Sequence, residues 1–222
     1  MNPGSPRPRI VSDSTGYTLA ELLVAMAVGS LVVGSAVMLT GQIQKSYGSQ
    51  LDGAAVQQEA RYAMDWITRA LQSAGSNPSS LNVAECPAAG TTFRAIRRDP
   101  NADAVNNDVR IHADINPPNG LLGGLAGGCV EAGEDVTIAH DVANRTITRR
   151  DNNVGAAAVP MSDTVITQLL FQYFRASGAA ATTDDGVATV RVTITARTPA
   201  IDAYTGQPVN FTITSDVRMR AR

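Results

Sequence analysis

The chain has 222 residues and a formal net charge of −2, from 18 basic and 20 acidic side chains. This length supports one sizeable domain with an appendage and is short for two independent catalytic domains. Aromatic residues make up 5% of the chain. With its near-neutral charge, the chain offers little of the positive field and stacking surface on which nucleic-acid binding depends, so nucleic acid is disfavoured as a main partner.

The first 16 residues form a polar leader that carries Arg7 and Arg9 and ends at Gly16. After Tyr17-Thr18-Leu19-Ala20-Glu21 comes an uninterrupted apolar run, Leu22–Leu39. As a helix this run would span roughly 27 Å, enough to cross a bilayer core. An ordinary secretory signal has its cleavage site after the apolar run. Here the small residue lies before the run, so cleavage there would leave the apolar segment attached to the mature protein.

Glu21 is unusual because a carboxylate beside a membrane span is costly unless something neutralises it. Two interpretations are open. Glu21 either sits in the headgroup region as an acid that favours the N-terminal end of the helix dipole, or it belongs to a specific motif with Gly16 and the leader.

At these residues the sequence resembles the type IV prepilin family, whose motif is a glycine, a large first mature residue and a glutamate at the fifth mature position before an apolar helix. The usual first residue is Phe, and this chain has Tyr17. The resemblance implies that a prepilin peptidase cuts between Gly16 and Tyr17 and methylates the new amine. It also implies that Glu21 acts in assembly by pairing with the N-terminal amine of a neighbouring subunit.

The chain therefore divides into a leader at 1–16, an N-terminal helix at 17–75 with a transmembrane part at 22–39, and a β-rich head at 76–222. Positive flanks remain cytoplasmic, so Arg7 and Arg9 place the leader inside and the head in the periplasm, before transfer to an extracellular pilus. In that oxidising compartment Cys86 and Cys129 are expected to form a disulfide, with two buried free thiols as the alternative. Small residues four apart, which permit close helix packing in a filament, are Ala25, Gly29, Ser30 and Gly34.

The helical pattern continues beyond the apolar run until Gly75 and Pro78, which are typical residues for a helix end. In residues 45–74 one face is predicted to pack against the head. The residues expected on this face are Leu51, Ala55, Ala63, Ile67 and Leu71, with Tyr62, Trp66 and Ala70 beside them. The head is expected to fold without the span from about Lys45 onward.

After residue 79 the hydrophobic period changes from 3.6 to 2, which predicts half-buried antiparallel strands. The clearest alternation lies at 188–197 and 211–220. Further strands are expected at 91–96, 109–115, 136–140, 146–149 and 165–174, with an irregular insertion at 97–135. The fold class is thus α+β and pilin-like, a long N-terminal helix packed on an antiparallel β-sheet head.

The order of features in the head is also similar to the PilW-like minor pilins and the J-type pseudopilins of type II secretion. The similar stretches are VRIHADINPPNG, DVTIAHDVANRTITRR, VITQLLFQYFRASG and VRVTITARTP with FTITSDVRMRAR. The resemblance implies assembly with other major and minor pilins, residence in the inner membrane before assembly, and a tip adhesin as a further partner.

Little in the sequence points to chemistry. The loop Asp114–Gly120 has oxygen ligands at alternating positions, but it lacks the downstream glutamate of a calcium loop and is interpreted as a surface turn. Asp184-Asp185-Gly186 reads as a hairpin turn, and Arg218, Arg220 and Arg222 as a solvated face. Neither His112 nor His140 lies near a nucleophile motif. No enzyme, cofactor or metal site is predicted.

Three functions follow from the sequence. The first is a minor pilin at or near the tip of a type IV pilus, which primes assembly and presents its head to an adhesin or partner. The second is a type II secretion pseudopilin of the piston tip. The third is a DNA-capturing pilin of a competence pilus.

Overall fold

A computed structural model of the chain describes residues 16–76, 84–85, 94–115, 121–122, 132–155, 157–202 and 205–219. The chain forms two compact units, 1–47 and 48–222. Each unit is described by itself, although one helix, α1 (Leu19–Ser73), contributes to both. The architecture is α+β, with this single long helix and antiparallel sheets in the head, as the sequence predicts.

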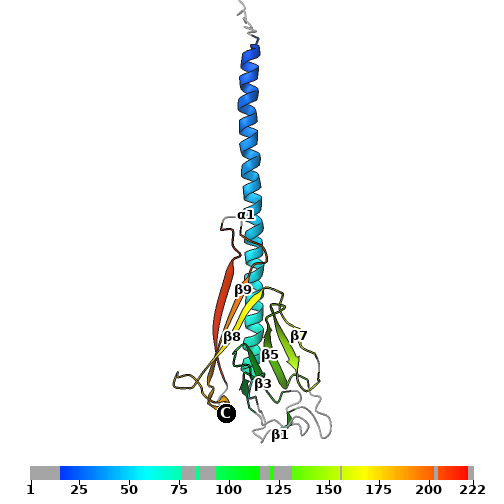
Figure 1. The fold of residues 1–222 in the computed structure, drawn as a ribbon, viewed down its shortest axis with the longest axis vertical. Coiled ribbons are helices and arrows are strands. Elements are labelled where there is room, and N and C mark those ends of the chain that lie inside the picture. The colour runs from blue at the N-terminus through cyan, green and yellow to red at the C-terminus, as the bar shows by residue number, and fades with distance from the viewer. Residues whose placement is uncertain are drawn as a thin grey trace, which may run out of the picture. The chain divides into compact units, whose positions relative to one another are not determined.

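The head contains one sheet of five strands in the order β2-β3-β5-β6-β7 and one of three strands in the order β10-β9-β8 (Figure 1). All neighbours in both sheets are antiparallel. The strands of the first are β2 (Ile96–Arg98), β3 (Asp108–His112), β5 (Asp135–Asp141), β6 (Thr146–Asp151) and β7 (Val159–Pro160). Those of the second are β8 (Ile166–Phe174), β9 (Thr189–Arg197) and β10 (Asn210–Arg218). A short parallel pair joins β1 (Ala84–Glu85) to β4 (Leu121–Leu122).

The two sheets meet along β8, whose backbone N–H groups donate hydrogen bonds to carbonyls in the loops of the five-stranded sheet. The backbone N–H of Phe171 donates to the carbonyl of Asn106 at 2.8 Å, and that of Ile166 donates to the carbonyl of Arg145 at 2.9 Å. These bonds satisfy donors at the edge of the three-stranded sheet that would otherwise be buried without a partner. The sheets therefore share one core.

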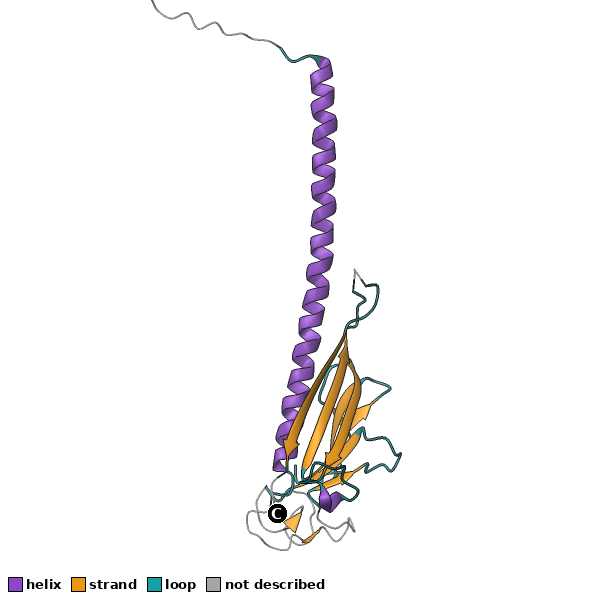
Figure 2. Cartoon of the chain, turned by 90° about the vertical axis from the view of Figure 1, so that its left-hand side faces the viewer, coloured by secondary structure: helices purple, strands orange, loops and turns teal. Residues whose placement is uncertain are grey.

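Within the second unit, the C-terminal half of α1 lies along the sheets (Figure 2). Its buried residues are Val56, Ala60, Ala63, Met64, Ile67 and Leu71. They join one cluster with side chains from β3, β5, β6, β8 and β9. Trp66 and Ala70 are partly buried against the same cluster, and Trp66 is thus a packing residue rather than an exposed binding aromatic.

The predicted helix face is wrong at its N-terminal end. Leu51 is 53% exposed, Tyr62 is 56% exposed and Ala55 is also exposed, whereas Val56 and Ala60 are buried in their place. The buried face follows Val56, Ala60, Ala63, Ile67 and Leu71, which are spaced by three or four residues. The prediction assumed that the larger apolar side chains are the buried ones. In the structure the small side chain of Ala60 allows a sheet to approach the helix closely, and the large Tyr62 lies on the opposite side.

The strand predictions are confirmed over most of the head. Val190, Val192, Ile194 and Ala196 of β9 are buried and alternate with exposed or half-buried residues, as predicted. Of the strand expected at 91–96, residues 91–93 lie outside the described residues, Arg94 and Ala95 are not in a strand, and Ile96 begins β2. The strand expected at 109–115 ends at His112, since Ala113 to Ile115 leave the extended ladder.

Two predicted turns also differ from the structure. Asp184–Gly186 forms a 3₁₀ turn, η1, within a longer connection between β8 and β9, rather than a tight hairpin. Asp114 is fully buried and its N–H donates to the carbonyl of Ser76, so the first residue of the expected Asp114–Gly120 surface turn is a core residue. Residues 116–120 of that turn, together with Cys86, Cys129, Arg220 and Arg222, lie outside the described residues.

Gly75 ends α1 in the predicted manner. Its φ is +73°, its N–H donates to the carbonyl of His112 at 2.8 Å, and a Cβ at this position would lie 2.8 Å from the Cβ of Ala95. Both the backbone conformation and the space thus require glycine. The helix end is thereby fixed to β3.

We expect Gly75→Ala to destabilise the head by about 1–3 kcal/mol, because the variant combines a left-handed backbone with a steric clash. Gly155→Ala is the matched control, since Gly155 has a φ of +64° but no atom within 4 Å of an added Cβ. Urea unfolding of the detergent-solubilised chain, followed by the fluorescence of the single Trp66, measures both. Equal losses in the two variants would contradict the role of the close contact with Ala95.

Candidate functional site at the start of the helix

A reciprocal hydrogen-bond arrangement between Thr18 and Glu21 begins α1. The Glu21 N–H donates to Thr18 Oγ1 at 3.3 Å, while Glu21 Oε2 accepts from the Thr18 N–H at 2.9 Å and from the Thr18 hydroxyl at 3.1 Å. This is a capping box, which satisfies backbone donors that the first helical turn leaves free. Thr18 is therefore the residue that sequence reasoning missed, although the spacing Thr-x-x-Glu is its known signal.

The capping box favours the first interpretation of Glu21, an acid at the positive end of the helix, and leaves room for the second. Both accepted bonds use Oε2, and the side chain is exposed. The Oε1 atom therefore lies outside the box and is available to another cation. One carboxylate can cap its own helix and also carry charge to a neighbour.

The apolar run that follows Glu21 is exposed on all sides in its unit, including Leu22, Val24, Leu31 and Leu39. In the described residues, α1 is the one helix long and apolar enough to cross a membrane. A helix that is apolar on every side needs an apolar surrounding, either lipid or other helices. The head does not supply it, because the buried residues of α1 begin at Val56.

The predicted packing residues Ala25, Gly29, Ser30 and Gly34 are exposed on this segment. No atom lies within 4 Å of a Cβ built on Gly29 or Gly34. The Ser30 hydroxyl donates to the carbonyl of Ala27 at 2.8 Å, so its polar group is satisfied inside the helix. This surface is thus open to close approach by a second helix.

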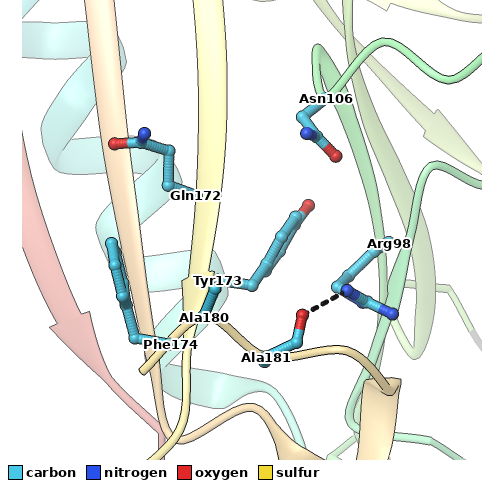
Figure 3. A pocket seen from close by; sticks show the side chains of 7 residues that line it. All are labelled: Arg98, Asn106, Gln172, Tyr173, Phe174, Ala180 and Ala181. Carbon is cyan, nitrogen blue, oxygen red and sulfur yellow. Dashed lines mark hydrogen bonds between the residues drawn. The ribbon is translucent and has the colours of Figure 1, made fainter. Parts of the chain in front are cut away.

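The head has a hollow of about 230 Å³ where the β2–β3 and β8–β9 connections meet (Figure 3). Its walls are Arg98, Asn106, Gln172, Tyr173, Phe174, Ala180 and Ala181. The Arg98 guanidinium donates to Asp184 and to the carbonyls of Ala181 and Thr182 at 2.8–3.0 Å. It also lies 5.7 Å from the Tyr173 ring centroid. Arg98 thus binds the end of β2 to the β8–β9 connection.

Asp108, the first residue of β3, is buried near this hollow, and the Tyr173 hydroxyl approaches its carbonyl at 3.4 Å. Burial and the negative charges of Asp99 and Asp103 raise the pKa of the Asp108 carboxyl to about 6. Sequence reasoning did not single out this residue.

The two histidines have structural surroundings. His112 is buried, its Nδ1 accepts from the Arg94 N–H at 3.3 Å, and its Nε2 lies 3.5 Å from Asp135 Oδ1. Burial lowers the pKa of His112 to about 4, so the ring is neutral at neutral pH. His140 Nε2 lies 3.1 Å from the carbonyl of Ile166. Both rings are held by the fold rather than paired with a nucleophile.

Comparison with known proteins adds one match. Residues 12–37 match a family model described as the prokaryotic N-terminal methylation motif. No curated protein and no solved structure matches the chain. The match supports a prepilin-family protein, processed by a prepilin peptidase and assembled with other pilins. At that level the match supports a pilin or pseudopilin subunit, a structural class that is usually non-enzymatic.

If cleavage falls between Gly16 and Tyr17, as the sequence predicts, Gly16→Val should block processing, because a branched side chain should not fit a small-residue peptidase subsite. Gly4→Val, at a leader glycine far from the junction, is the control and should be processed normally. Mass spectrometry of the purified chain reads the outcome directly. A mature chain that begins after Leu39 would instead identify an ordinary signal peptide.

Substitutions at Glu21 can separate its role in capping the helix from the role of its negative charge. Glu21→Gln keeps the capping box, because glutamine can accept the same bonds, but loses the charge. We expect it to be cleaved normally and to enter filaments about tenfold less, equivalent to about 1.4 kcal/mol per binding step. Glu21→Ala should lose both functions, and Thr18→Ala should weaken only the cap. Quantitative blotting of sheared filaments measures incorporation, and wild-type amounts of Glu21→Gln would rule out the charge pairing.

Proposed function

We propose that this chain is a minor pilin, a low-abundance subunit at or near the tip of a type IV pilus that primes assembly with other minor subunits. The observation that carries the proposal is the junction at Gly16 and Tyr17, followed by a capped helix with an exposed carboxylate at Glu21 and an apolar run that the head leaves uncovered. The apolar run anchors the chain in the inner membrane before assembly. The same run then packs in the filament core.

The head supports the minor role rather than the bulk role. A bulk subunit stacks many times through one repeated surface, whereas a tip subunit needs only a few unlike neighbours. The hollow is bounded by the ends of β2 and β8, at Arg98 and Tyr173, and by the irregular β2–β3 and β8–β9 connections, at Asn106 and Ala181. Irregular loops held on a rigid scaffold suit specific docking. We assign this end of the head to contact with a neighbouring minor subunit or adhesin.

A type II secretion pseudopilin of the piston tip is the second candidate, because it requires the same junction, helix and head. Loss of secreted enzymes with normal pili in a deletion strain would identify it. A DNA-capturing pilin is disfavoured by the net charge of −2, and DNA binding that weakens steeply with salt would identify that function.

Deletion of the gene should reduce the number of filaments several-fold without changing their thickness, because a priming subunit controls initiation and not the repeating lattice. Electron microscopy of the deletion strain and of a complemented strain measures both quantities. Coexpression with the other minor subunits of the system should also yield a defined complex. Filaments composed mainly of this chain would refute the minor role and leave the pilin assignment standing.

A further inference from the structure

The connection between β2 and β3 has the ligand order of a calcium-binding loop. Its sequence from Asp99 is DPNADAVNND. Calcium loops place side-chain oxygens at the first, third and fifth positions and a backbone carbonyl at the seventh. Counted from Asp99, these positions hold Asp99, Asn101, Asp103 and Val105.

The backbone of the connection follows the same pattern. The sixth position of a calcium loop is glycine because the chain turns sharply there. In this chain the sixth position is Ala104, with a φ of +64°, and Ala102 and Asp99 also have positive φ, +58° and +48°. Glycine and asparagine are the usual residues at positive φ, so this connection adopts a sharp turn without them.

Hydrogen bonds tie the three polar side chains to this turn. The Asp99 carboxylate accepts from the N–H groups of Asp103 and Ala104 at 3.1 and 2.9 Å. Asn101 Oδ1 accepts from the Asp103 N–H at 3.2 Å, and Asp103 Oδ1 accepts from the Val105 N–H at 2.8 Å. Each of these oxygens retains a lone pair for a further ligand.

Asp108, three residues after Val105, is the independent observation. Its side chain is 2% exposed, and in the described part of the chain its Oδ1 has no hydrogen-bond partner. The carboxyl lies near the Asn101 backbone and within the electrostatic reach of Asp99 and Asp103. A buried carboxylate oxygen that lacks a hydrogen-bond donor and feels two further negative charges is unfavourable without a cation.

A neighbouring arginine does not supply that cation. Arg98, next to Asp99 in sequence, directs its guanidinium to Asp184 and to the carbonyls of Ala181 and Thr182. Arg110, at the twelfth loop position where a calcium loop has glutamate, binds Asp135 through both carboxylate oxygens. Both bases therefore have acidic partners elsewhere in the head.

We propose that the Asp99–Asp108 loop binds one Ca²⁺ through Asp99, Asn101, Asp103 and Asp108, with backbone carbonyl oxygens completing the shell. An all-oxygen set in an irregular loop favours Ca²⁺ over the smaller Mg²⁺, which requires near-ideal octahedral geometry. Among the described residues, no three acidic or histidine side chains are already spaced to hold a metal, so binding draws the carboxylates together. Without the glutamate at position twelve, the affinity belongs to the weak extracellular class, with a Kd of about 10⁻⁴–10⁻³ M.

Calcium at this loop would stabilise the hydrogen bonds through which the loop contacts both sheets. The carbonyl of Asn106 accepts the Phe171 N–H of β8, and the carbonyl of Asn107 accepts the His140 N–H of β5 at 3.1 Å. Asn106 also forms one wall of the hollow in Figure 3. The site thus concerns the head alone and does not depend on whether the subunit serves a pilus or a secretion system.

The experiment uses the full chain in detergent micelles, freed of metal with a chelator. Thermal unfolding, followed by Trp66 fluorescence, is measured in EDTA, in Ca²⁺ and in Mg²⁺. Ca²⁺ should raise the melting temperature in a saturable manner, and Mg²⁺ should raise it much less. Isothermal titration should give one site per chain.

Asp103→Asn and Asp108→Asn should each abolish the Ca²⁺-dependent rise or weaken Ca²⁺ binding at least about tenfold, since each removes a ligand charge. Melting in EDTA shows that the variants fold, and Asp108→Asn should melt no lower than the wild type, because it loses a buried charge. Asp141→Asn is the matched control and should retain the full response, because Asp141 ends β5, where its carboxylate accepts from the Asn144 N–H.

Three outcomes would overturn the proposal. The first is an unchanged melting temperature at Ca²⁺ on the order of 10 mM, well above the expected Kd. The second is an equal rise with Mg²⁺, which indicates general charge screening. The third is a full Ca²⁺ response in both loop variants, which places the ion elsewhere in the chain.

Discussion

The structure depends on one helix, α1, whose backbone hydrogen bonds must be satisfied both along its exposed apolar segment and where it packs against the head. A backbone in an apolar phase has to satisfy its hydrogen bonds internally, and a helix does so everywhere except at its ends. In α1 the start is closed by Thr18 and Glu21, and the end is closed by Gly75 against His112. Between these ends the side chains change from apolar on every side to apolar on one face. The first pattern suits lipid or a helix bundle, and the second holds the head.

Much of this arrangement can be predicted from sequence because its causes are local. An uncharged run, a change of period from 3.6 to 2 and a glycine at the helix end each act over a few neighbouring residues. The strands β5, β6, β8, β9 and β10 were predictable for this reason. The buried face of α1 was only partly so, because the choice of Ala60 over Tyr62 depends on how closely a sheet approaches, which is a tertiary property.

The candidate sites divide in the same way. Gly16, Tyr17 and Glu21 lie within six residues and form a recognisable linear motif. The Asp99–Asp108 loop was missed although its order of oxygen ligands is also linear. Arg110 replaces the expected glutamate, and the significance of Asp108 emerges only when β3 buries its side chain. The hollow near Arg98 could not have been predicted, because its walls come from residues that are about 80 positions apart in the chain.

The capping box at Thr18 and Glu21 has a consequence for maturation. Every atom that closes the start of the helix belongs to a residue beyond Tyr17. Under the proposed cleavage the leader can therefore be removed without unwinding a turn, and the helix enters assembly in the conformation that it already has. Processing then changes mainly the charge: Arg7, Arg9 and Asp13 leave with the leader, and the terminal amine moves from Met1 to Tyr17, four residues before the Glu21 carboxylate. Cleavage by the peptidase would thus change the charge at the start of a helix that is already formed.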